Sequence, residues 1–473
     1  MKIKSFLKKN ILIISVLLFI LSLSLFLTLT MQVDPDYFWH IKSGEYMFNN
    51  GILKKDIFSW FLYGKYWMSH EWIFELIVYG LKILFGEVHM LIYGFICIFI
   101  LLLILFLGNK NNYLKNIPFM LFWMILSLIL VVFIQVRPHL ISFIFVALTI
   151  WFLYDLYKNE RSKKIYFLPF LSILWSNIHG GSSNLSYLFC FIFLIGGLFS
   201  FDFQKIEAKR IGQLQIKKYL IAMLLSVIGV CINIHGIKMF TYPYLNMMDS
   251  VMLNNISEWQ PTSLSNPQHY LYFGLIILIF FIMLFSKKKI NFMDFILFGI
   301  SVFLGLKSIR FWGYTYIIMS FVIFNYVEKR KYDKRNYLCI IFISLILFGY
   351  FIFNINTTFD NLKNRKLKDD LIELLRNEEV KRLYNFYDYG GELVYNDISV
   401  FIDGRADLYS KYNYNDYLNI SLLQGDYIKL IDKYNFDYFL VNSNYPISVY
   451  LSYSDDYKKI YDSSDVVLYK KNS

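Results

Sequence analysis

The chain has 473 residues, of which 57% are hydrophobic and only 17% charged, and its formal net charge is +12. A soluble protein of this length could not bury so much apolar surface, so we expect lipid to cover part of it. The Lys and Arg residues gather in short loops between apolar runs, which indicates membrane topology and excludes nucleic acid as the expected partner. The four cysteines fall inside apolar runs and are predicted to be small core residues.

Apolar runs of about 20 residues, the length that crosses the hydrocarbon layer, recur along the chain. The first run, Ile11 to Met31, follows four lysines and lacks a small-residue cleavage site, so we predict an uncleaved anchor. The segment 70–86 carries Glu71, Glu75 and Lys82 and is predicted to be an amphipathic helix in the membrane interface. The eleven predicted spans are 11–31, 88–108, 117–136, 138–157, 165–179, 184–201, 218–234, 269–286, 292–308, 311–327 and 336–354.

Loop charge predicts how these spans are oriented. With the N-terminus in the cytoplasm, the inner loops hold clusters of Lys and Arg, while the outer connections are poorer in both for their length. If 70–86 spanned the membrane, the later basic clusters would face outward, so the charge pattern favours eleven spans with the C-terminal segment outside. The same threading puts all seven histidines at or near the outer face, which favours an extracytoplasmic site. The predicted inner loops are 109–116, 158–164, 202–217, 287–291 and 328–335.

The last ~115 residues change character, a size that suits one small domain. They are polar, with helical patterns at Leu367–Asn377 and near Asp416–Tyr434. We therefore predict a polytopic α-helical membrane body over 1–355, with its first outer loop at 32–87, and a small extracytoplasmic α/β domain over 356–473. The predicted strands of that domain are Leu393–Asn396, Val400–Asp403, Tyr438–Val441 and Val466–Tyr469.

The first outer loop carries the most informative polar residues. Asp34 and Asp36 lie one residue apart, with His40 close behind and His70 and Glu71 later in the loop. Carboxylates and histidines in this pattern can hold a divalent cation or act as a general base. We predict Asp34, Asp36 and Glu71 as catalytic residues, His40 as substrate-binding, and Asp34, Asp36, His70 and Glu71 as ligands of a possible divalent metal cation. The alternative is that the two aspartates only cap the span and favour its orientation.

Later outer turns add polar residues of a second kind. An arginine at the outer edge of a membrane protein suits a phosphate, because its planar fork donates bidentate hydrogen bonds. Glycines after His179 would let the backbone approach a ligand closely. For each residue alone the alternative is structural, such as a snorkelling arginine or a glycine turn. The predicted substrate-binding residues on these turns are Arg137, His139, His179, His235, Glu258, Lys307 and Arg310.

The stretch DPDYFWHIKSGEYM, followed by IFSW and HEWIFE, resembles the first outer loop of the GT-C glycosyltransferases. The chain looks most like a bacterial branch of that superfamily with RP(H/Q), N-x-HGG, EW-x-P and FIDGRADLY motifs in this order. The resemblance covers most of the chain. It implies an enzyme that takes a sugar from a polyprenyl-phosphate or polyprenyl-diphosphate carrier outside the cytoplasm. Asp34 or Asp36 would be the catalytic carboxylate, and Glu71 with His70 a second contact to a metal or to the acceptor. The four motifs correspond here to Arg137–His139, Asn177–Gly181, Glu258–Pro261 and Phe401–Tyr409.

The expected function is therefore that of a multi-pass plasma-membrane glycosyltransferase. Its donor would be a polyprenyl-phosphate sugar and its acceptor a glycan, lipid or protein. One alternative is a metal-independent surface-glycan polymerase or ligase; another is a transporter, which the near absence of mid-span charge disfavours. Oligosaccharyltransferases carry a W-W-D-Y-G acceptor motif in a longer outer domain, whereas residues 386–390 here read FYDYG, which we interpret as a turn at a strand edge.

Reporter fusions test the predicted topology. Fusions after residues 160 and 212 should read cytoplasmic, because they fall in basic loops, and a fusion after residue 470 should read external. The measurement is the ratio of a periplasm-active to a cytoplasm-active reporter. An external signal at 212 would contradict the threading.

Overall fold

In a computed structural model that describes residues 2–329 and 336–472, the chain divides into two compact units. Residues 33–87, the predicted first outer loop, belong to the same unit as 363–473 and not, as predicted, to the membrane body 1–355. The loop is therefore part of the fold of the C-terminal segment. The helical unit comprises Met1–Gln32, Val88–Tyr244 and Ile256–Leu362, and the α/β unit comprises Val33–Glu87, Leu245–Asn255 and Lys363–Ser473.

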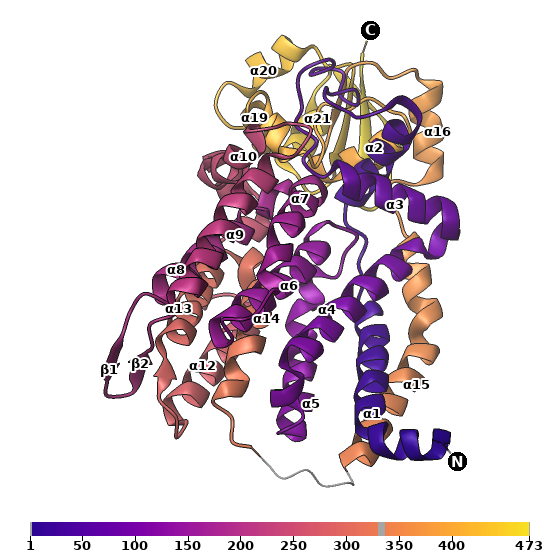
Figure 1. The fold of residues 1–473 in the computed structure, drawn as a ribbon. Coiled ribbons are helices and arrows are strands. Elements are labelled where there is room, and N and C mark those ends of the chain that lie inside the picture. Colours follow the sequence, from indigo (N-terminus) through magenta and orange to yellow (C-terminus); the bar gives the residue numbers. More distant parts are fainter. Residues whose placement is uncertain (1, 330–335, 473) are drawn as a thin grey trace. The chain divides into compact units, whose positions relative to one another are not determined.

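Each predicted span coincides with helical structure (Figure 1), but the helices differ in length. Among the described residues, six segments are long and apolar enough to cross a membrane: Asn10–Thr28, Trp72–Tyr113, His139–Lys158, Gln213–Cys231, Pro267–Phe285 and Tyr337–Lys363. The remaining predicted spans form shorter helices, so the structure supports a membrane protein without confirming the count of eleven. The helices of this region are α1 (Lys2–Thr28), α4 (His89–Tyr113), α5 (Ile117–Ile125), η2 (Leu126–Phe133), α6 (His139–Lys158), α7 (Leu168–Ile178), α8 (Leu185–Gly196), α9 (Gln213–Cys231), α10 (Lys238–Met248), α12 (Tyr270–Phe285), α13 (Phe292–Lys307), α14 (Trp312–Val322) and α15 (Asn336–Lys363).

Polar side chains inside the apolar helices bond to their own backbone. The Ser24 hydroxyl donates to the carbonyl of Ile20 at 2.7 Å, and the Thr28 hydroxyl donates to the carbonyl of Ser24 at 2.8 Å. Such bonds satisfy a hydroxyl where water is absent. Between helices, the Trp123 ring stacks on Tyr316 at 5.6 Å and its indole N–H donates to Ser320 at 2.8 Å. Hydrogen bonds within and between helices therefore hold these polar side chains inside the apolar body.

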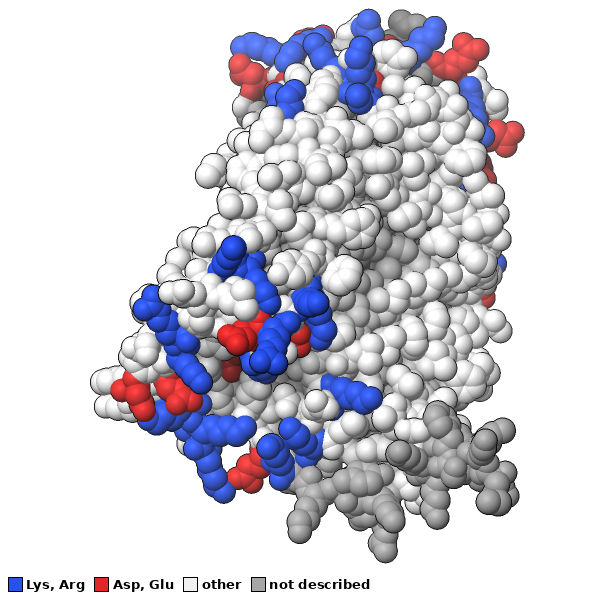
Figure 2. Space-filling view, in the orientation of Figure 1, with Lys and Arg blue, Asp and Glu red and all other residues white. Residues whose placement is uncertain are grey.

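The predicted inner loops meet at one end of the helical unit. The Asn116 side chain donates to the carbonyl of Glu328 at 2.8 Å, Lys287 pairs with Glu328 at 2.8 Å, and Lys218 donates to the carbonyl of Ser162 at 3.0 Å. Figure 2 shows Lys and Arg gathered at this end, around the hairpin of β1 (Phe201–Phe203) and β2 (Ile206–Ala208), beside a broad uncharged surface. Because α6 alone spans about 30 Å, these loops lie far from the turn before His139.

The α/β unit is built on a four-stranded mixed sheet with the order β4-β5-β7-β6. β4 pairs parallel with β5, and β7 pairs antiparallel with both β5 and β6. The strands are β4 (Leu383–Asn385), β5 (Tyr438–Asn442), β6 (Tyr457–Asp462) and β7 (Val466–Lys471). The helices are α2 (Asp36–Asn50), α3 (Trp72–Phe85), α11 (Ser250–Asn255), α16 (Asp369–Asn377), η9 (Tyr387–Tyr389), α17 (Gly390–Tyr395), α18 (Ala406–Tyr409), α19 (Tyr414–Leu422), α20 (Tyr427–Tyr434) and α21 (Pro446–Tyr453).

Two of the four predicted strands are confirmed as β5 and β7, and the predicted helix at 367–377 is confirmed as α16. The prediction of a strand at Leu393–Asn396 is wrong, because these residues form the last part of the helix α17 and the first residue of the turn after it. A short apolar run has no periodicity that separates a strand from a buried helix. The helical stretch near Asp416–Tyr434 is two helices, since Leu423 adopts a left-handed conformation (φ 55°) that ends α19.

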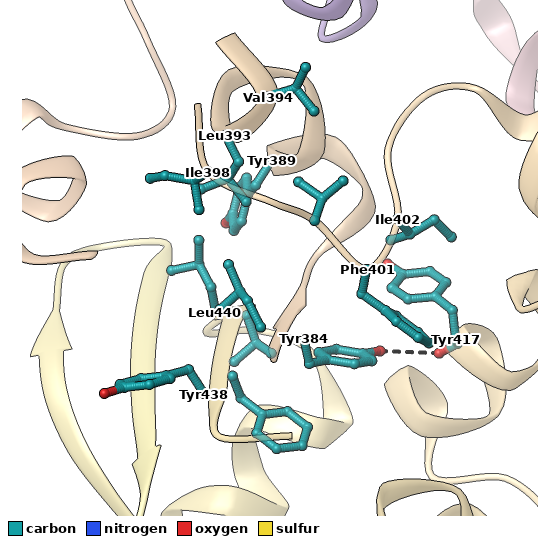
Figure 3. Close-up of a cluster of buried hydrophobic side chains, with 14 of the residues drawn as sticks. Tyr384, Tyr389, Leu393, Val394, Ile398, Phe401, Ile402, Tyr417, Tyr438 and Leu440 are labelled. Carbon is teal, nitrogen blue, oxygen red and sulfur yellow. Dashed lines mark hydrogen bonds between the residues drawn. The ribbon is translucent and has the colours of Figure 1, made fainter. Parts of the chain in front are cut away.

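Residues of the first outer loop complete the core of this unit. The core joins Trp39, Phe58 and Trp67 of the loop to the apolar side chains of the sheet and its helices. Figure 3 shows the C-terminal part, where the Tyr384 hydroxyl donates to the carbonyl of Tyr417 at 3.1 Å. Backbone bonds at Val400 tie it to the loop, because its N–H donates to Phe58 at 3.1 Å and its carbonyl accepts from Trp60 at 3.1 Å.

A fully buried arginine joins these two parts of the chain electrostatically. The Arg405 side chain is 1% exposed, and its guanidinium donates to both carboxylate oxygens of Asp403, at 2.8 Å from Nε and 2.6 Å from Nη2. Its Nη1 donates to Asp56 of the first loop at 2.6 Å, and Asp56 is also fully buried. The guanidinium also lies 4.8 Å from the Trp67 ring. Two carboxylates and one guanidinium leave this network with a net negative charge that further hydrogen bonds must stabilise, including one from the Tyr409 hydroxyl to Asp403 at 2.9 Å.

Removing one partner of this network should destabilise the protein strongly. We expect Asp56→Ala to cost about 3–5 kcal/mol, because it leaves part of a buried guanidinium without its carboxylate. The measurement is the midpoint of thermal unfolding of the purified chain in detergent. As a control, Asp426→Ala removes the exposed Asp426–Lys429 pair, whose side chains are 75% and 80% exposed, and should shift the midpoint little. Equal shifts for the two variants would contradict the assigned role of Asp56.

Candidate functional site

Residues from four distant turns meet in the helical unit. Arg137, which precedes α6, donates from Nη1 to the Glu258 carboxylate at 2.5 Å. Glu258 belongs to η5 (Ser257–Trp259), 121 residues further along the chain. The side chains of Arg137 and Glu258 are 20% and 31% exposed, so the pair is sheltered but can be reached from solvent. The sequence singled out both residues without predicting that they touch.

A second arginine lies in the same group. Arg310, in η7 (Ile309–Phe311), places its guanidinium 4.9 Å from the Trp259 ring and its Nη2 at 3.3 Å from Nε2 of His179. The backbone fixes this arrangement, because the Ser308 hydroxyl donates to the carbonyl of Glu258 at 2.8 Å. Arg137, His179, Glu258, Trp259 and Arg310 are called the arginine cluster below.

The tautomer of His179 follows from its neighbours. The Arg310 guanidinium can only donate, so Nε2 of His179 must accept and the ring proton lies on Nδ1. Nδ1 lies 2.6 Å from the Ser142 hydroxyl and 3.0 Å from the Ser182 hydroxyl, and the Trp175 indole donates to both hydroxyls at 3.0 Å. These buried partners, which sequence reasoning missed, hold the neutral imidazole against Arg310. Their only sequence signal is that Ser182 follows the His-Gly-Gly motif directly.

The cluster has a surplus of positive charge. Burial alone would raise the pKa of Glu258, but the charges of Arg137 and Arg310 outweigh burial and lower the pKa to about 2. Glu258 is therefore ionised at every physiological pH. Two guanidiniums and one carboxylate leave a formal charge of +1, with His179 neutral. A group of this charge and donor chemistry can bind a phosphate.

The other substrate-binding residues predicted on the outer turns lie in different settings. His139 is buried, and its Nε2 lies 2.6 Å from the carbonyl of Phe133, so its ring bonds to backbone. His235 follows α9, and its backbone N–H donates to the Asn233 side chain at 2.9 Å. Lys307 ends α13 with an exposed side chain. None of these contacts joins the three residues to the arginine cluster.

In the α/β unit, the predicted carboxylates begin α2. Asp34 is 6% exposed, and its Oδ1 accepts the backbone N–H of Asp36 at 2.8 Å. Asp36, the first residue of α2, is half-buried, and an acidic side chain in the first turn is stabilised by the helix dipole. Asp34 thus orders the turn before α2, and Asp36 stands half-buried at the start of that helix.

His40 lies between two carboxylates in the same unit. Its Nε2 is 3.6 Å from Glu71 and its Nδ1 is 3.5 Å from Glu75, and the His40 side chain is almost completely buried. The geometry suits orientation of these carboxylates more than contact with a substrate. His70 pairs with Glu71 at 3.1 Å. Burial would lower the pKa of His70, but the adjacent Glu71 charge raises it to about 9, so His70 is a cation at neutral pH.

The metal prediction receives no geometric support. Within 2–329 and 336–472, no group of three or more His, Cys, Asp and Glu side chains is arranged to hold a metal ion. The predicted ligands Asp34, Asp36, His70 and Glu71 therefore do not form a ready coordination site. Glu75, which has no predicted site role, lies 3.5 Å from His40.

The chain is distantly similar in structure to an oligosaccharyltransferase. The apo-form crystal structure of the oligosaccharyltransferase of Archaeoglobus fulgidus has a TM-score of 0.48 and 11% sequence identity to this chain, over 86% of this chain and 66% of that one. The chain thus spans just under two thirds of that protein's length. No family model matches the sequence, and no curated protein matches it. Similarity at this level does not assign an activity.

The ionisation of Glu258 predicts a pH dependence of stability. Its folded pKa of about 2 lies below the ordinary 4.5, so its contribution is fully present above pH 4.5 and is lost as the pH falls toward 2. We expect Glu258→Gln to lower the thermal midpoint at neutral pH, and this difference from wild type to narrow between about pH 5 and pH 3. A matched control is Glu328→Gln, since Glu328 pairs with Lys287 at the exposed surface. A midpoint difference between wild type and Glu258→Gln that stays constant with pH would contradict the Arg137–Glu258 ion pair.

Proposed function

We propose that this chain is an integral membrane glycosyltransferase that transfers a sugar from a polyprenyl-phosphate-linked donor to an acceptor on the extracytoplasmic face. The observation that carries the proposal is the arginine cluster. Two guanidiniums, Arg137 and Arg310, come together from turns that are far apart in the sequence, beside a neutral His179. A sheltered cationic group in an apolar helical body suits a ligand with a phosphate and a long hydrocarbon chain.

The charge and geometry of the cluster suit a phosphate. Each guanidinium offers planar paired donors that match two phosphate oxygens. Glu258 holds Arg137 in place without cancelling the positive charge of the cluster. The isoprenoid chain of the donor would lie along the apolar helices, which explains why the enzyme would need a membrane body. The acceptor could be a glycan, a lipid or a protein.

The proposed reaction is a substitution at the anomeric carbon of the donor sugar. The acceptor hydroxyl oxygen forms the new bond to that carbon while the bond from the carbon to the phosphate oxygen breaks. The polyprenyl phosphate leaves with the electron pair, and Arg137 and Arg310 stabilise its charge. The hydroxyl proton passes to a general base, and Asp34 and Asp36, predicted from the sequence as catalytic carboxylates, are the residues to test for that role. No step is assigned to a metal, because the predicted ligands do not form a coordination site.

A metal-independent polymerase or ligase of surface glycans is the second candidate. The observation that favours it is the Asx turn in which Asp34 accepts the N–H of Asp36, because it gives Asp34 a structural role. In that enzyme the arginine cluster would still bind the lipid-linked donor, while neither aspartate would be needed. Transfer assays with a panel of polyprenyl-phosphate sugars, with and without chelator, test the proposed activity and its metal dependence together.

Substitution of the arginines tests the phosphate assignment. Arg137→Lys or Arg310→Lys keeps the charge but loses the planar fork, so the donor KM should rise about tenfold, and roughly a hundredfold for Arg→Ala. The acceptor KM should change little. Arg161→Lys, at an exposed loop, is the matched control and should leave both constants unchanged. An unchanged donor KM in the cluster variants would move the phosphate site elsewhere, with Lys307 the next candidate.

Substitution of the aspartates separates the two candidate functions. Asp36→Asn and Asp34→Asn should each abolish transfer while leaving expression and thermal stability near wild type. Asparagine keeps an oxygen that can accept the N–H of residue 36, so the turn before α2 survives. Asp388→Asn, at an exposed pair with Lys366, is the control and should remain active. Full activity in both test variants would refute the carboxylate mechanism and favour the polymerase or ligase.

A further inference from the structure

The Asp-Gly-Arg segment at 403–405 has a second contact besides its ion network. Gly404 lies directly against the start of α2, where a Cβ atom at this position would overlap a carboxylate oxygen of Asp36. The same Cβ would lie 2.7 Å from Cγ of Asp36 and 3.0 Å from the indole nitrogen of Trp39. Only a residue without a side chain leaves the Asp36 carboxylate where it is.

The neighbours of Gly404 are held rigidly. Asp403 Oδ1 accepts the backbone N–H of Arg405 at 3.0 Å as well as its Nε, which closes a tight loop around the glycine. The Arg405 guanidinium is anchored to Asp56 at 2.6 Å in the core of the unit. The glycine backbone is therefore a fixed surface, and the Asp36 side chain is the movable partner.

Trp39 extends this contact to the other acidic residues of the loop. Its ring lies 3.7 Å from the ring of His40, centroid to centroid. His40 in turn lies within 3.6 Å of Glu71 and 3.5 Å of Glu75. A shift at Gly404 would therefore reach Asp36 directly and the glutamates through Trp39 and His40.

We infer that Gly404 is a positioning residue: its bare backbone, fixed by the Arg405 network, sets the place of the Asp36 carboxylate. The C-terminal segment thus completes the carboxylate site of the first outer loop. The consequence for catalysis rests on the proposed function, whereas the positioning itself does not.

The test variant is Gly404→Ala. Its φ does not lie in the left-handed region, so alanine is compatible with the backbone, and the overlap falls on the end of a short side chain. The variant should fold with a displaced Asp36 carboxylate. Carbodiimide-activated amine labelling, read by mass spectrometry, should show the labelling rate of Asp36 changed about threefold or more, while that of the exposed Asp388 stays constant.

A thermal double-mutant cycle gives an independent readout. Gly404→Ala should lower the midpoint of thermal unfolding. In the double variant with Asp36→Ala the overlapping oxygen is gone, so the midpoint should lie ~2 °C or more above the value expected from the sum of the two single shifts. The control is Gly44→Ala, in the same helix, whose Cβ would overlap the Glu75 carbonyl and lie 2.8 Å from the Tyr79 Cβ. The midpoint shifts caused by Gly44→Ala and Asp36→Ala should be additive.

The outcomes separate this inference from the proposed function. Additive midpoints together with unchanged Asp36 labelling would overturn the positioning role. Coupled midpoints and altered labelling support it, even if no polyprenyl-phosphate sugar proves to be a donor. If transfer is found, Gly404→Ala should lower kcat at least tenfold with the donor KM unchanged. Full kcat in that variant would overturn the catalytic consequence.

Discussion

The buried ion network of Arg405 is the constraint on which the α/β unit depends. One guanidinium pairs with Asp403 beside it and with Asp56 of the first loop, in a core where an unpaired charge would be costly. The network therefore joins two segments that the sequence separates by most of the chain. Aromatic rings around the guanidinium and the backbone bonds at Val400 strengthen the same junction. The Asp36 carboxylate at the start of α2 lies against Gly404, which this network holds in place.

The helical unit follows a different physical rule. Hydroxyls such as those of Ser24 and Thr28 bond to the backbone of their own helix, and ion pairs lie in the turns at the two ends. At one end, lysines bond to carbonyls and scattered acidic residues. At the other, arginines are held by one glutamate, one tryptophan and one neutral histidine. Only the second arrangement leaves directed donors beside an apolar body, and that is why the proposed phosphate site lies there.

Sequence patterns predicted the elements that depend on local signals. Apolar length located helical structure at each predicted span but missed α10, and alternation located β5 and β7. The motif residues Arg137, His179, Glu258 and Arg310 were named from their outer turns, but their mutual contacts were not, because contact between distant turns depends on tertiary packing. The first loop was predicted to belong to the membrane body, but it belongs to the α/β unit, because its partners also lie far along the chain. Nothing local in Asp56 indicates that its partner is Arg405.

The pairing of Asp56 with Arg405 also concerns the order in which the chain is synthesised. The two residues are 349 positions apart, so nearly the whole polypeptide must emerge before the ion network can close. Until then the first loop lacks the partner for its carboxylate and for the aromatic side chains that share its core, and closure of so long a loop is slow. A chain interrupted before residue 405 would keep this surface uncovered and open to proteases. The α/β unit thereby couples assembly of its acidic site to completion of translation.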